Sequence, residues 1–329
     1  MFPELGIEYY RLNIDLPYSE QKPVDAILHK LSDQVGVPSE ENDRMIAWFR
    51  ETQKLHPNLM FIDNCEKLDI FVRRSYSYEV ATQAIQNGHL SDVLSVPKYA
   101  VLPRGENIRE FLERESSPSC SLPLIEIALP ILVKPEWQNG DSTHVIEVII
   151  SPSSLPVSYD IDMVIQEYKD HNGVIYKAYA IADKAFLEIR YSLPNNPIDK
   201  YTIDRLKKCP LSFSKSAEVE TKNNEIIHGK PVETESLTLE LVTKYVTEIE
   251  KILQMDLIGV DFIVDSADPG RVFCIDVNLF PSFTGFPDVS RVFGEFILRK
   301  CAKCFVCCRD YLWMERQAVN CIPIVGKHN

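Results

Sequence analysis

The sequence has no apolar run of about 18 residues, the length that a helix needs to cross a bilayer, so a membrane span is not expected. Its opening stretch, MFPELGIEYY, lacks the basic residues and the apolar core of a secretory leader. Positive charge is scarce, because 35 Lys and Arg face 48 Asp and Glu and leave a net charge of −13 at pH 7. This balance argues against general nucleic-acid binding and predicts that any polyanion site is a local basic patch.

Nine cysteines, an odd number in 329 residues, are untypical of a secreted disulfide framework, and we expect a reducing, cytoplasmic environment. Cys301, Cys304, Cys307 and Cys308 lie close together near the C-terminus. On a helix, three of them share one apolar face, which favours a buried core over a metal site or exposed, acylated thiols. With 45% hydrophobic and 25% charged residues, the composition is that of a globular protein of one to three domains.

The first 96 residues alternate between short apolar runs and helical patterns, which predicts a small α/β layer domain. Asp63 or Asn64 is placed to cap a helix. The expected strands are 5–15, 24–30 and 59–62, and the expected helices are 40–55 and 76–86.

From residue 97 onwards, short apolar runs separated by Gly, Asn, Ser and Pro predict antiparallel strands. Apolar residues at helical spacing predict one helix over 239–253 and another over 289–308. Residues 193–235 are polar and are expected to be irregular. The remaining expected elements are a helix over 106–115, a loop over 116–122, and strands over 130–134, 145–150, 162–168, 174–181 and 185–191.

Two apolar runs around an Asp-, Pro- and Gly-containing turn, within 257–286, predict a β-hairpin. Asp276 and Asn278 leave one face of the second strand together, because alternate residues of a strand point the same way. Asp261, inside the first strand, completes a patch of oxygen ligands of the kind that Mg²⁺ prefers. A carboxylate inside an apolar strand needs a partner, which favours a metal site over the alternative that these acids merely face solvent.

Lys134 ends one of the expected strands and precedes a loop that contains Gly140 and His144. Such a lysine could hold nucleotide phosphates as a point charge, with the backbone N–H groups of the loop over them. The alternative is a surface lysine beside an ordinary hairpin, and a single glycine does not decide between the two. A lone histidine such as His144 is more often structural than functional.

The segment 166–168 ends another strand, where it either offers backbone groups to an adenine edge or is a plain strand end. Lys177, Arg190 and Ser192 belong to the two strands that follow. The two cations form either a phosphate-binding face or a pair of surface side chains that extend into solvent.

Taken in order, several motifs resemble those of one known family. They are HKLSD at 29–33, RSYSYE at 74–79, ILVK at 131–134, NGDSTH at 139–144, HNGVIYK at 171–177, and GVDFIVD through IDVNLFPSFTG at 259–285. In order and spacing they are similar to the inositol-tetrakisphosphate 1-kinases, also called inositol-trisphosphate 5/6-kinases, of the ATP-grasp fold. The resemblance extends from about Gly6 to Leu298.

This resemblance implies an α/β and α+β architecture in which two lobes clamp ATP between antiparallel sheets. The implied parts are a small N-terminal α/β domain over 1–96, a first lobe over 97–182, and a second lobe with the metal site and C-terminal helix over 183–329. The implied reaction is Mg²⁺-dependent transfer of the γ-phosphoryl group of ATP to an inositol polyphosphate. The acceptor is inositol 1,3,4-trisphosphate at the 5/6-position or inositol 3,4,5,6-tetrakisphosphate at the 1-position.

The resemblance also implies roles for individual residues. Two Mg²⁺ ions are held by Asp261, Asp276 and Asn278, and the catalytic residues are Lys134, Asp276 and Asn278. The implied ATP contacts are Arg74, Lys134, Gln166, Glu167, Tyr168, Lys177, Ser192 and Ser214. The implied inositol-phosphate contacts are Lys30, His144, Lys177, Arg190 and Asn278.

The sequence departs from the family in four places. Asn139 stands where the loop of the family has histidine, Pro135-Glu136 replaces Thr-Arg, and Ser282 replaces a glycine. The first strand of the family, with its substrate-binding lysine, has no counterpart before Phe2. We therefore expect weak inositol-phosphate binding, and self-association if a strand edge is left open, whereas a covered edge favours a monomer. The alternatives are a family member that binds without turnover and an ATP-grasp carboxylate–amine ligase.

Overall fold

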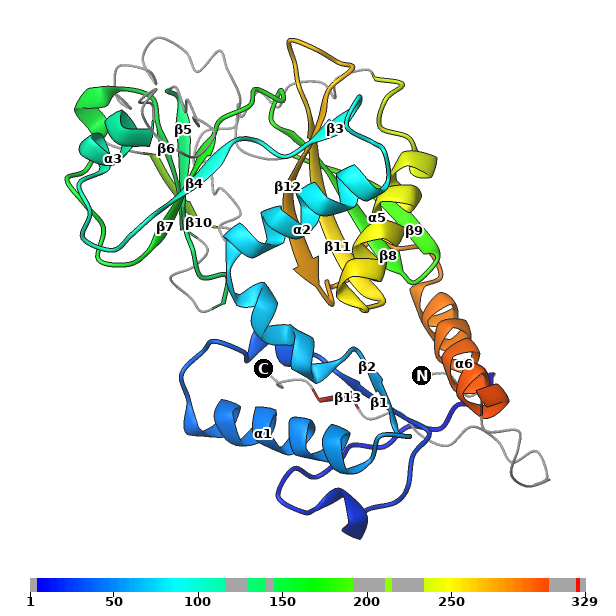
Figure 1. The fold of residues 1–329 in the computed structure, drawn as a ribbon. Coiled ribbons are helices and arrows are strands. Elements are labelled where there is room, and N and C mark those ends of the chain that lie inside the picture. Colours follow the sequence, from blue (N-terminus) through cyan, green and yellow to red (C-terminus); the bar gives the residue numbers. More distant parts are fainter. Residues whose placement is uncertain are drawn as a thin grey trace, which may run out of the picture.

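The computed structural model describes residues 5–115, 129–139, 145–191, 211–214, 234–307 and 324–325. Three sheets organise these residues, one in the N-terminal part and one in each of two lobes above it (Figure 1). None of the helices in these ranges is long and apolar enough to cross a membrane.

The N-terminal sheet has three parallel strands in the order β13-β1-β2, from Ile324–Val325, Ala26–His29 and Met60–Ile62. Helix α1 (Glu40–Leu55) lies beside this sheet, and its N-terminus is capped by Ser39, whose Oγ accepts from the backbone N–H of Asn42. The 3₁₀ helix over Cys65–Val72 begins after Asn64, which caps it as one of the two expected residues. Both expected strands over 24–30 and 59–62 and the helix over 40–55 are confirmed.

The strand expected over 5–15 is wrong, because this segment has no strand structure. Ile7 and Leu12 are nevertheless buried, so the apolar pattern reflects packing against the core and not pairing with a neighbour. One side of β1 pairs with β13, through Leu28 opposite Ile324 and His29 opposite Val325, and the other side pairs with β2. The open edge was expected on a strand over 5–15, and because this segment is not a strand, that edge does not form.

The first lobe contains a five-stranded antiparallel sheet in the order β10-β6-β5-β7-β4. Helix α3 (Ile108–Glu115) packs on it through Ile108 and Phe111, which join the core of this lobe. The strands are β4 (Tyr99–Leu102), β5 (Ile131–Pro135), β6 (Val145–Ile149), β7 (Met163–Glu167) and β10 (Leu211–Ser214). Strand β10 lies within the stretch that was expected to be irregular, and the expected loop over 116–122 lies outside the described residues.

The second lobe contains a five-stranded sheet in the order β3-β12-β11-β8-β9, antiparallel except for the β3–β12 pair. Helices α2 (Arg74–Asn87) and α5 (Leu239–Leu253) pack together over this sheet (Figure 1). The strands are β3 (Leu94–Ser95), β8 (Val174–Ile181), β9 (Lys184–Tyr191), β11 (Leu257–Val264) and β12 (Val272–Leu279).

Sheet membership divides the two lobes between β7 and β8 and not at the expected boundary between residues 182 and 183, because β8 pairs with β9 and β11. Strand β3, expected in the N-terminal domain, likewise belongs to the sheet of the second lobe. Helix α6 (Val289–Cys307) packs between that lobe and the N-terminal sheet, in a cluster that includes Leu28 and Phe296. Cys301 is buried in this cluster as expected, whereas the side chains of Cys304, Cys307 and Cys308 lie outside the described residues.

Candidate active site between the lobes

Three charged side chains form a row across neighbouring strands of the second lobe. Lys177 on β8 is paired in register with Asp261 on β11, which is paired in register with Asp276 on β12. Lys177 Nζ lies 3.1 Å from Asp261 Oδ1 and 3.3 Å from Asp261 Oδ2. Asn278 lies two residues further along β12, and its Nδ2 donates to Asp276 Oδ2 at 3.2 Å.

A β-bulge in β12 determines which way this row faces. Asp261 pairs with Asp276, but Phe262 pairs with Cys274, so Ile275 is an extra residue on β12. Before the bulge, Val272 and Cys274 pack into the core, whereas after it the core residues are Val277 and Leu279. Without the extra residue, alternation would turn Asp276 and Asn278 into that core.

Two buried carboxylates directly opposite each other repel, so the row needs nearby cations. Asp261 and Asp276 are 8% and 4% exposed. Lys177 contacts the first, and Arg74 NH1 lies 3.7 Å from Asp276 Oδ1. Burial works to lower the pKa of Lys177, but the Asp261 carboxylate, with smaller contributions from Asp276 and Tyr179, outweighs burial. The pKa of Lys177 is therefore above its ordinary value, and the ammonium stays charged at neutral pH.

Arg74 connects the two lobes. It is the first residue of α2 and is 2% exposed. Its Nε donates to the carbonyl of Pro135 at the end of β5 at 2.8 Å, while its guanidinium also approaches Asp276. One buried cation therefore contacts a strand of each of the two sheets.

Lys134 and Gln166 meet in the first lobe. Lys134 Nζ donates to Gln166 Oε1 at 2.8 Å and to the hydroxyl of Tyr78 at 3.3 Å. Lys134 is 5% exposed and Gln166 is fully buried, so Lys134 is not the surface lysine of the alternative interpretation. Glu167 and Tyr168, the other predicted residues of this lobe, lie at the end of β7. The Glu167 carboxylate forms an ion pair with Lys169 Nζ at 2.7 Å, and the Tyr168 backbone N–H donates to the carbonyl of Pro130.

The predicted inositol-phosphate contacts that the structure describes come from the sheet of the second lobe and from the end of β1. Arg190 on β9 pairs with Glu188 at 2.9 Å, and Glu188 is in register opposite Lys177. Lys30 follows β1 and pairs with Asp33 at 3.0 Å. His144 and Ser192 lie outside the described residues, and of Ser214 only the backbone, in β10, is described.

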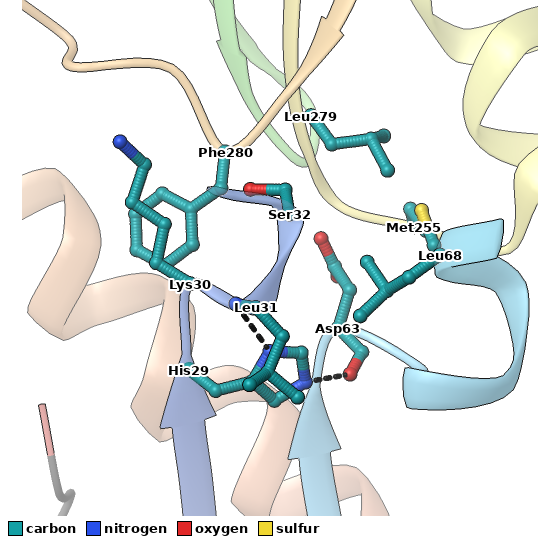
Figure 2. Close-up of a pocket in the computed structure, with 9 residues that line it drawn as sticks. All are labelled: His29, Lys30, Leu31, Ser32, Asp63, Leu68, Met255, Leu279 and Phe280. Carbon is teal, nitrogen blue, oxygen red and sulfur yellow. Dashed lines mark hydrogen bonds between the residues drawn. The ribbon is translucent and has the colours of Figure 1, made fainter. Parts of the chain in front are cut away.

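A pocket lies between the end of β1 and the end of β12 (Figure 2). Lys30 and Phe280 both line it, which places Lys30 near the strand end that carries Asn278. His29 beneath it donates from Nε2 to the carbonyl of Asp63 at 2.6 Å. Burial lowers the pKa of His29 to about 4, so its imidazole is neutral at pH 7. The lining residues are His29, Lys30, Leu31, Ser32, Asp63, Leu68, Met255, Leu279 and Phe280.

The residues of the row fit Mg²⁺ in their chemistry. Asp261, Asp276 and Asn278 offer carboxylate and carboxamide oxygens, and Mg²⁺ is typically held by one or two carboxylates together with substrate phosphates. Within the part of the chain that the structure describes, no three His, Cys, Asp or Glu side chains gather as a metal site. A Mg²⁺ ion held by these residues would need further ligands, such as nucleotide phosphates and water.

A model of the inositol 1,3,4-trisphosphate 5/6-kinase ATP-grasp domain matches residues 103–299, more than half of the chain. The chain belongs to this family. The family match confirms the predicted ATP-grasp fold.

Relatives of the chain in this 5/6-kinase family come from animals and plants. Inositol-tetrakisphosphate 1-kinase of Xenopus laevis is 23% identical over 290 residues, which cover 86% of this chain and 69% of that protein. Inositol-tetrakisphosphate 1-kinase 1 of Oryza sativa subsp. indica is 26% identical over 301 residues, which cover 89% of this chain and 76% of that protein. Among solved structures, VanG D-Ala:D-Ser ligase of Enterococcus faecalis has a TM-score of 0.47 at 15% identity, and the match covers 86% of this chain and 74% of that one.

Two residues that contact the candidate site of this family member, Tyr78 and Glu136, were not predicted as site residues from the sequence. Tyr78 lies one helical turn after Arg74, so the spacing of four within RSYSYE already placed both on one face. Glu136 accepts from the backbone N–H and the hydroxyl of Ser75 at the start of α2. Nothing in the local sequence around Glu136 points to this distant helix.

Proposed function

We propose that this chain is an ATP-dependent, Mg²⁺-dependent inositol polyphosphate kinase. Its acceptor is inositol 1,3,4-trisphosphate, at the 5/6-position, or inositol 3,4,5,6-tetrakisphosphate, at the 1-position. The observation that carries the proposal is the row of Lys177, Asp261 and Asp276 across three strands, with Arg74 beside it. Membership of the 5/6-kinase family supports the choice of acceptor.

Phosphoryl transfer depends mostly on positioning and on neutralising charge, and the described residues serve both needs. Arg74 and Lys134 approach from α2 and β5 and hold the nucleotide phosphates. Gln166, Glu167 and Tyr168 border the adenine at the end of β7.

Lys30, Lys177 and Arg190 supply positive charge for the phosphates of the acceptor, and Asn278 contacts it beside Asp276. We assign His144 to the same contacts and Ser192 and Ser214 to ATP. Mg²⁺, when bound at Asp261, Asp276 and Asn278, neutralises charge on the transferring phosphoryl group. No general base is required if the transition state is loose.

The proposal includes two Mg²⁺ ions, a cytoplasmic location and a monomer. Two ions are supported by the two carboxylates and the carboxamide in one patch. The cytoplasmic location is supported by the odd number of cysteines, and the monomer by the pairing of β1 on both sides.

Transfer of radiolabelled phosphate from ATP to the two inositol phosphates tests the proposal, with Asp276→Asn as the variant. Asn at this position keeps the shape but removes a charged ligand, and a loss of several kcal/mol of charge stabilisation lowers kcat by about a hundredfold or more. The melting temperature should stay close to that of the unaltered protein, because the substitution also removes the repulsion between the Asp276 and Asp261 carboxylates.

Asp268→Asn is the matched control, since Asp268 lies in the exposed turn after β11. Among the described residues, its side chain accepts a hydrogen bond only from the backbone N–H of Gly270. Its turnover should equal that of the unaltered chain. Tight inositol-phosphate binding without any transfer would point to the binding protein, and transfer only to a carboxylate in the presence of an amine would point to the ligase. Unchanged turnover in Asp276→Asn would contradict the assignment of the site.

A further inference from the structure

Tyr78 is buried at the meeting point of the two lobes. It lies one turn after Arg74 on α2 and is fully buried. Its ring packs against Tyr99 at a centroid distance of 4.8 Å, and the ammonium of Lys134 lies 5.9 Å from the centre of the Tyr78 ring. The helix that carries Arg74 to the site therefore also carries an aromatic side chain to the ammonium of Lys134.

The Tyr78 hydroxyl closes a triangle with Lys134 and Gln166. It accepts from Lys134 Nζ at 3.3 Å and donates to Gln166 Oε1 at 3.5 Å, while Lys134 Nζ donates to the same Oε1 at 2.8 Å. Burial raises the pKa of Tyr78 far above its ordinary value, so the phenol stays neutral and can accept and donate at once.

This triangle fixes the orientation of the Gln166 carboxamide. Its oxygen accepts from two donors, so its Nε2 must point elsewhere. That Nε2 is buried and has no hydrogen-bond partner within the described ranges. A buried donor without an acceptor costs free energy, and an acceptor atom on a bound nucleotide would satisfy it.

We propose that Tyr78 is a positioning residue for the nucleotide, acting through Lys134 and Gln166. Its hydroxyl holds the lysine ammonium and turns the donor end of the carboxamide towards the ligand. A lysine side chain has four rotatable bonds, so restraining its ammonium before the nucleotide arrives reduces the entropy lost on binding. The identity of the phosphoryl acceptor rests on the proposed function, but the role of Tyr78 concerns the nucleotide alone.

Tyr78→Phe tests this role, because it keeps the ring and its packing and removes only the hydroxyl. We expect the Kd for the non-hydrolysable analogue adenylyl imidodiphosphate with Mg²⁺, measured by calorimetry, to rise by about tenfold, the effect of one hydrogen bond to a charged group. The KM for ATP should rise with it, whereas the KM for the inositol phosphate should not change. A purely structural role would affect both substrates alike.

Tyr99→Phe is the matched control. Tyr99 belongs to the same ring pair, but its hydroxyl donates to the carbonyl of Ser75 at 3.4 Å and not to Lys134. Its nucleotide affinity should equal that of the unaltered chain. An unchanged Kd in Tyr78→Phe, or an equal rise in Tyr99→Phe, would overturn the proposal.

A double-mutant cycle with Gln166→Ala gives a second measurement. If the hydroxyl acts through the carboxamide, the double variant should bind the analogue about as weakly as Gln166→Ala alone, whereas additive losses would contradict this route. The analogue also separates the two proposals. If it binds but no inositol phosphate is phosphorylated, the proposed function fails while the role of Tyr78 is still decided by the binding data.

Discussion

A single carboxylate in the last turn of α5 makes the stability of this protein depend on pH. Burial, together with the nearby Asp256 carboxylate, raises the pKa of Glu250 to about 8. Its Oε1 is buried without a hydrogen-bond partner among the residues that the structure describes. A carboxylate at the C-terminal end of a helix also faces the helix carbonyls.

The direction of the effect follows from linkage. The folded pKa lies above the ordinary value of 4.5, so folding favours the protonated form of Glu250. The favourable contribution of Glu250 to the free energy of unfolding is present below pH 4.5 and is lost as the pH rises through about 8.

Glu250→Gln should therefore stabilise the protein at high pH. A gain of about 1 kcal/mol, reduced by the partial exposure of this side chain, corresponds to a rise in Tm of about 2–4 °C at about pH 9. Little change is expected at about pH 4.5, where the carboxyl is protonated. Thermal unfolding at the two pH values measures the difference. Glu240→Gln, at an exposed position in the first turn of the same helix, should show no such gain, and an equal gain at both pH values would refute the explanation.

The predicted metal ligands show what a sequence reveals about single positions. Asp261, Asp276 and Asn278 could be selected because carboxylates inside apolar strands need partners. The predicted common face of Asp276 and Asn278 matches the structure, but the bulge at Ile275 that turns them out of the core could not be predicted. A bulge depends on how two strands pair, and pairing is not encoded by the alternation within one strand.

At the scale of elements, the N-terminus of α2 is hydrogen-bonded to a residue from a distant part of the chain. Its N-cap residue Arg73 provides no side-chain hydrogen bond. Glu136, which follows β5, instead accepts from the backbone N–H of Ser75 at 3.3 Å and from its hydroxyl, and the Glu136 carbonyl accepts from Arg74 N–H at 2.8 Å. This departure from the family motif therefore has a structural role, because a carboxylate stabilises the positive end of a helix.

Glu136→Ala should destabilise the protein by about 0.5–2 kcal/mol, the range for the loss of a helix cap. The measurement is urea unfolding followed by far-UV circular dichroism. Glu136→Gln keeps an oxygen that can accept from Ser75, so its loss of stability should be smaller than that of Glu136→Ala. Equal stability of Glu136→Ala and the unaltered protein would show that α2 does not need this carboxylate.

Elements with strong local signals could be predicted, and elements that depend on distant pairing could not. The helices over 40–55 and 239–253 have long apolar periodicity, and α1 and α5 match them. The segment 5–15 carries an apolar pattern but has no neighbouring strand, while β10 has only four residues and depends on β6. Strand formation in both cases is decided by a partner far away in the sequence.

At the scale of the whole molecule, a buried acid connects the N-terminal domain to the second lobe. Asp63 follows β2, and its carboxylate accepts from the backbone N–H of Asp256 at 2.9 Å and of Leu257 at 3.3 Å. Leu257 is the first residue of β11, the strand that carries Asp261. This contact fixes the start of that strand against the N-terminal domain.

Asp63→Ala should leave two backbone N–H groups without an acceptor and destabilise the protein by about 1–3 kcal/mol. Calorimetric unfolding measures the loss, and Asp69→Ala is the control. Within the described ranges, the exposed Asp69 carboxylate forms an ion pair with Arg50 only. Exposed pairs contribute about 0–1 kcal/mol, so the control should change little. Equal losses in both variants would show that the Asp63 contact does not stabilise the domain arrangement.

The overall architecture could be predicted from the motifs, but the division into sheets could not. The motifs identified the ATP-grasp fold and placed Lys134, Asp261 and Asp276 in it. The boundary between the lobes was misplaced because β8 and β7 have similar apolar patterns, and only their hydrogen-bonded neighbours assign them to different sheets.

The pairing of β13 with β1 has a consequence for how the protein is made. On the ribosome, β1 emerges roughly 300 residues before β13, an interval of about 15–60 s at about 5–20 residues per second. During that time one side of β1 has no partner and can pair with another nascent chain. Of the three sheets, the N-terminal one is thus the first to begin and the last to be completed.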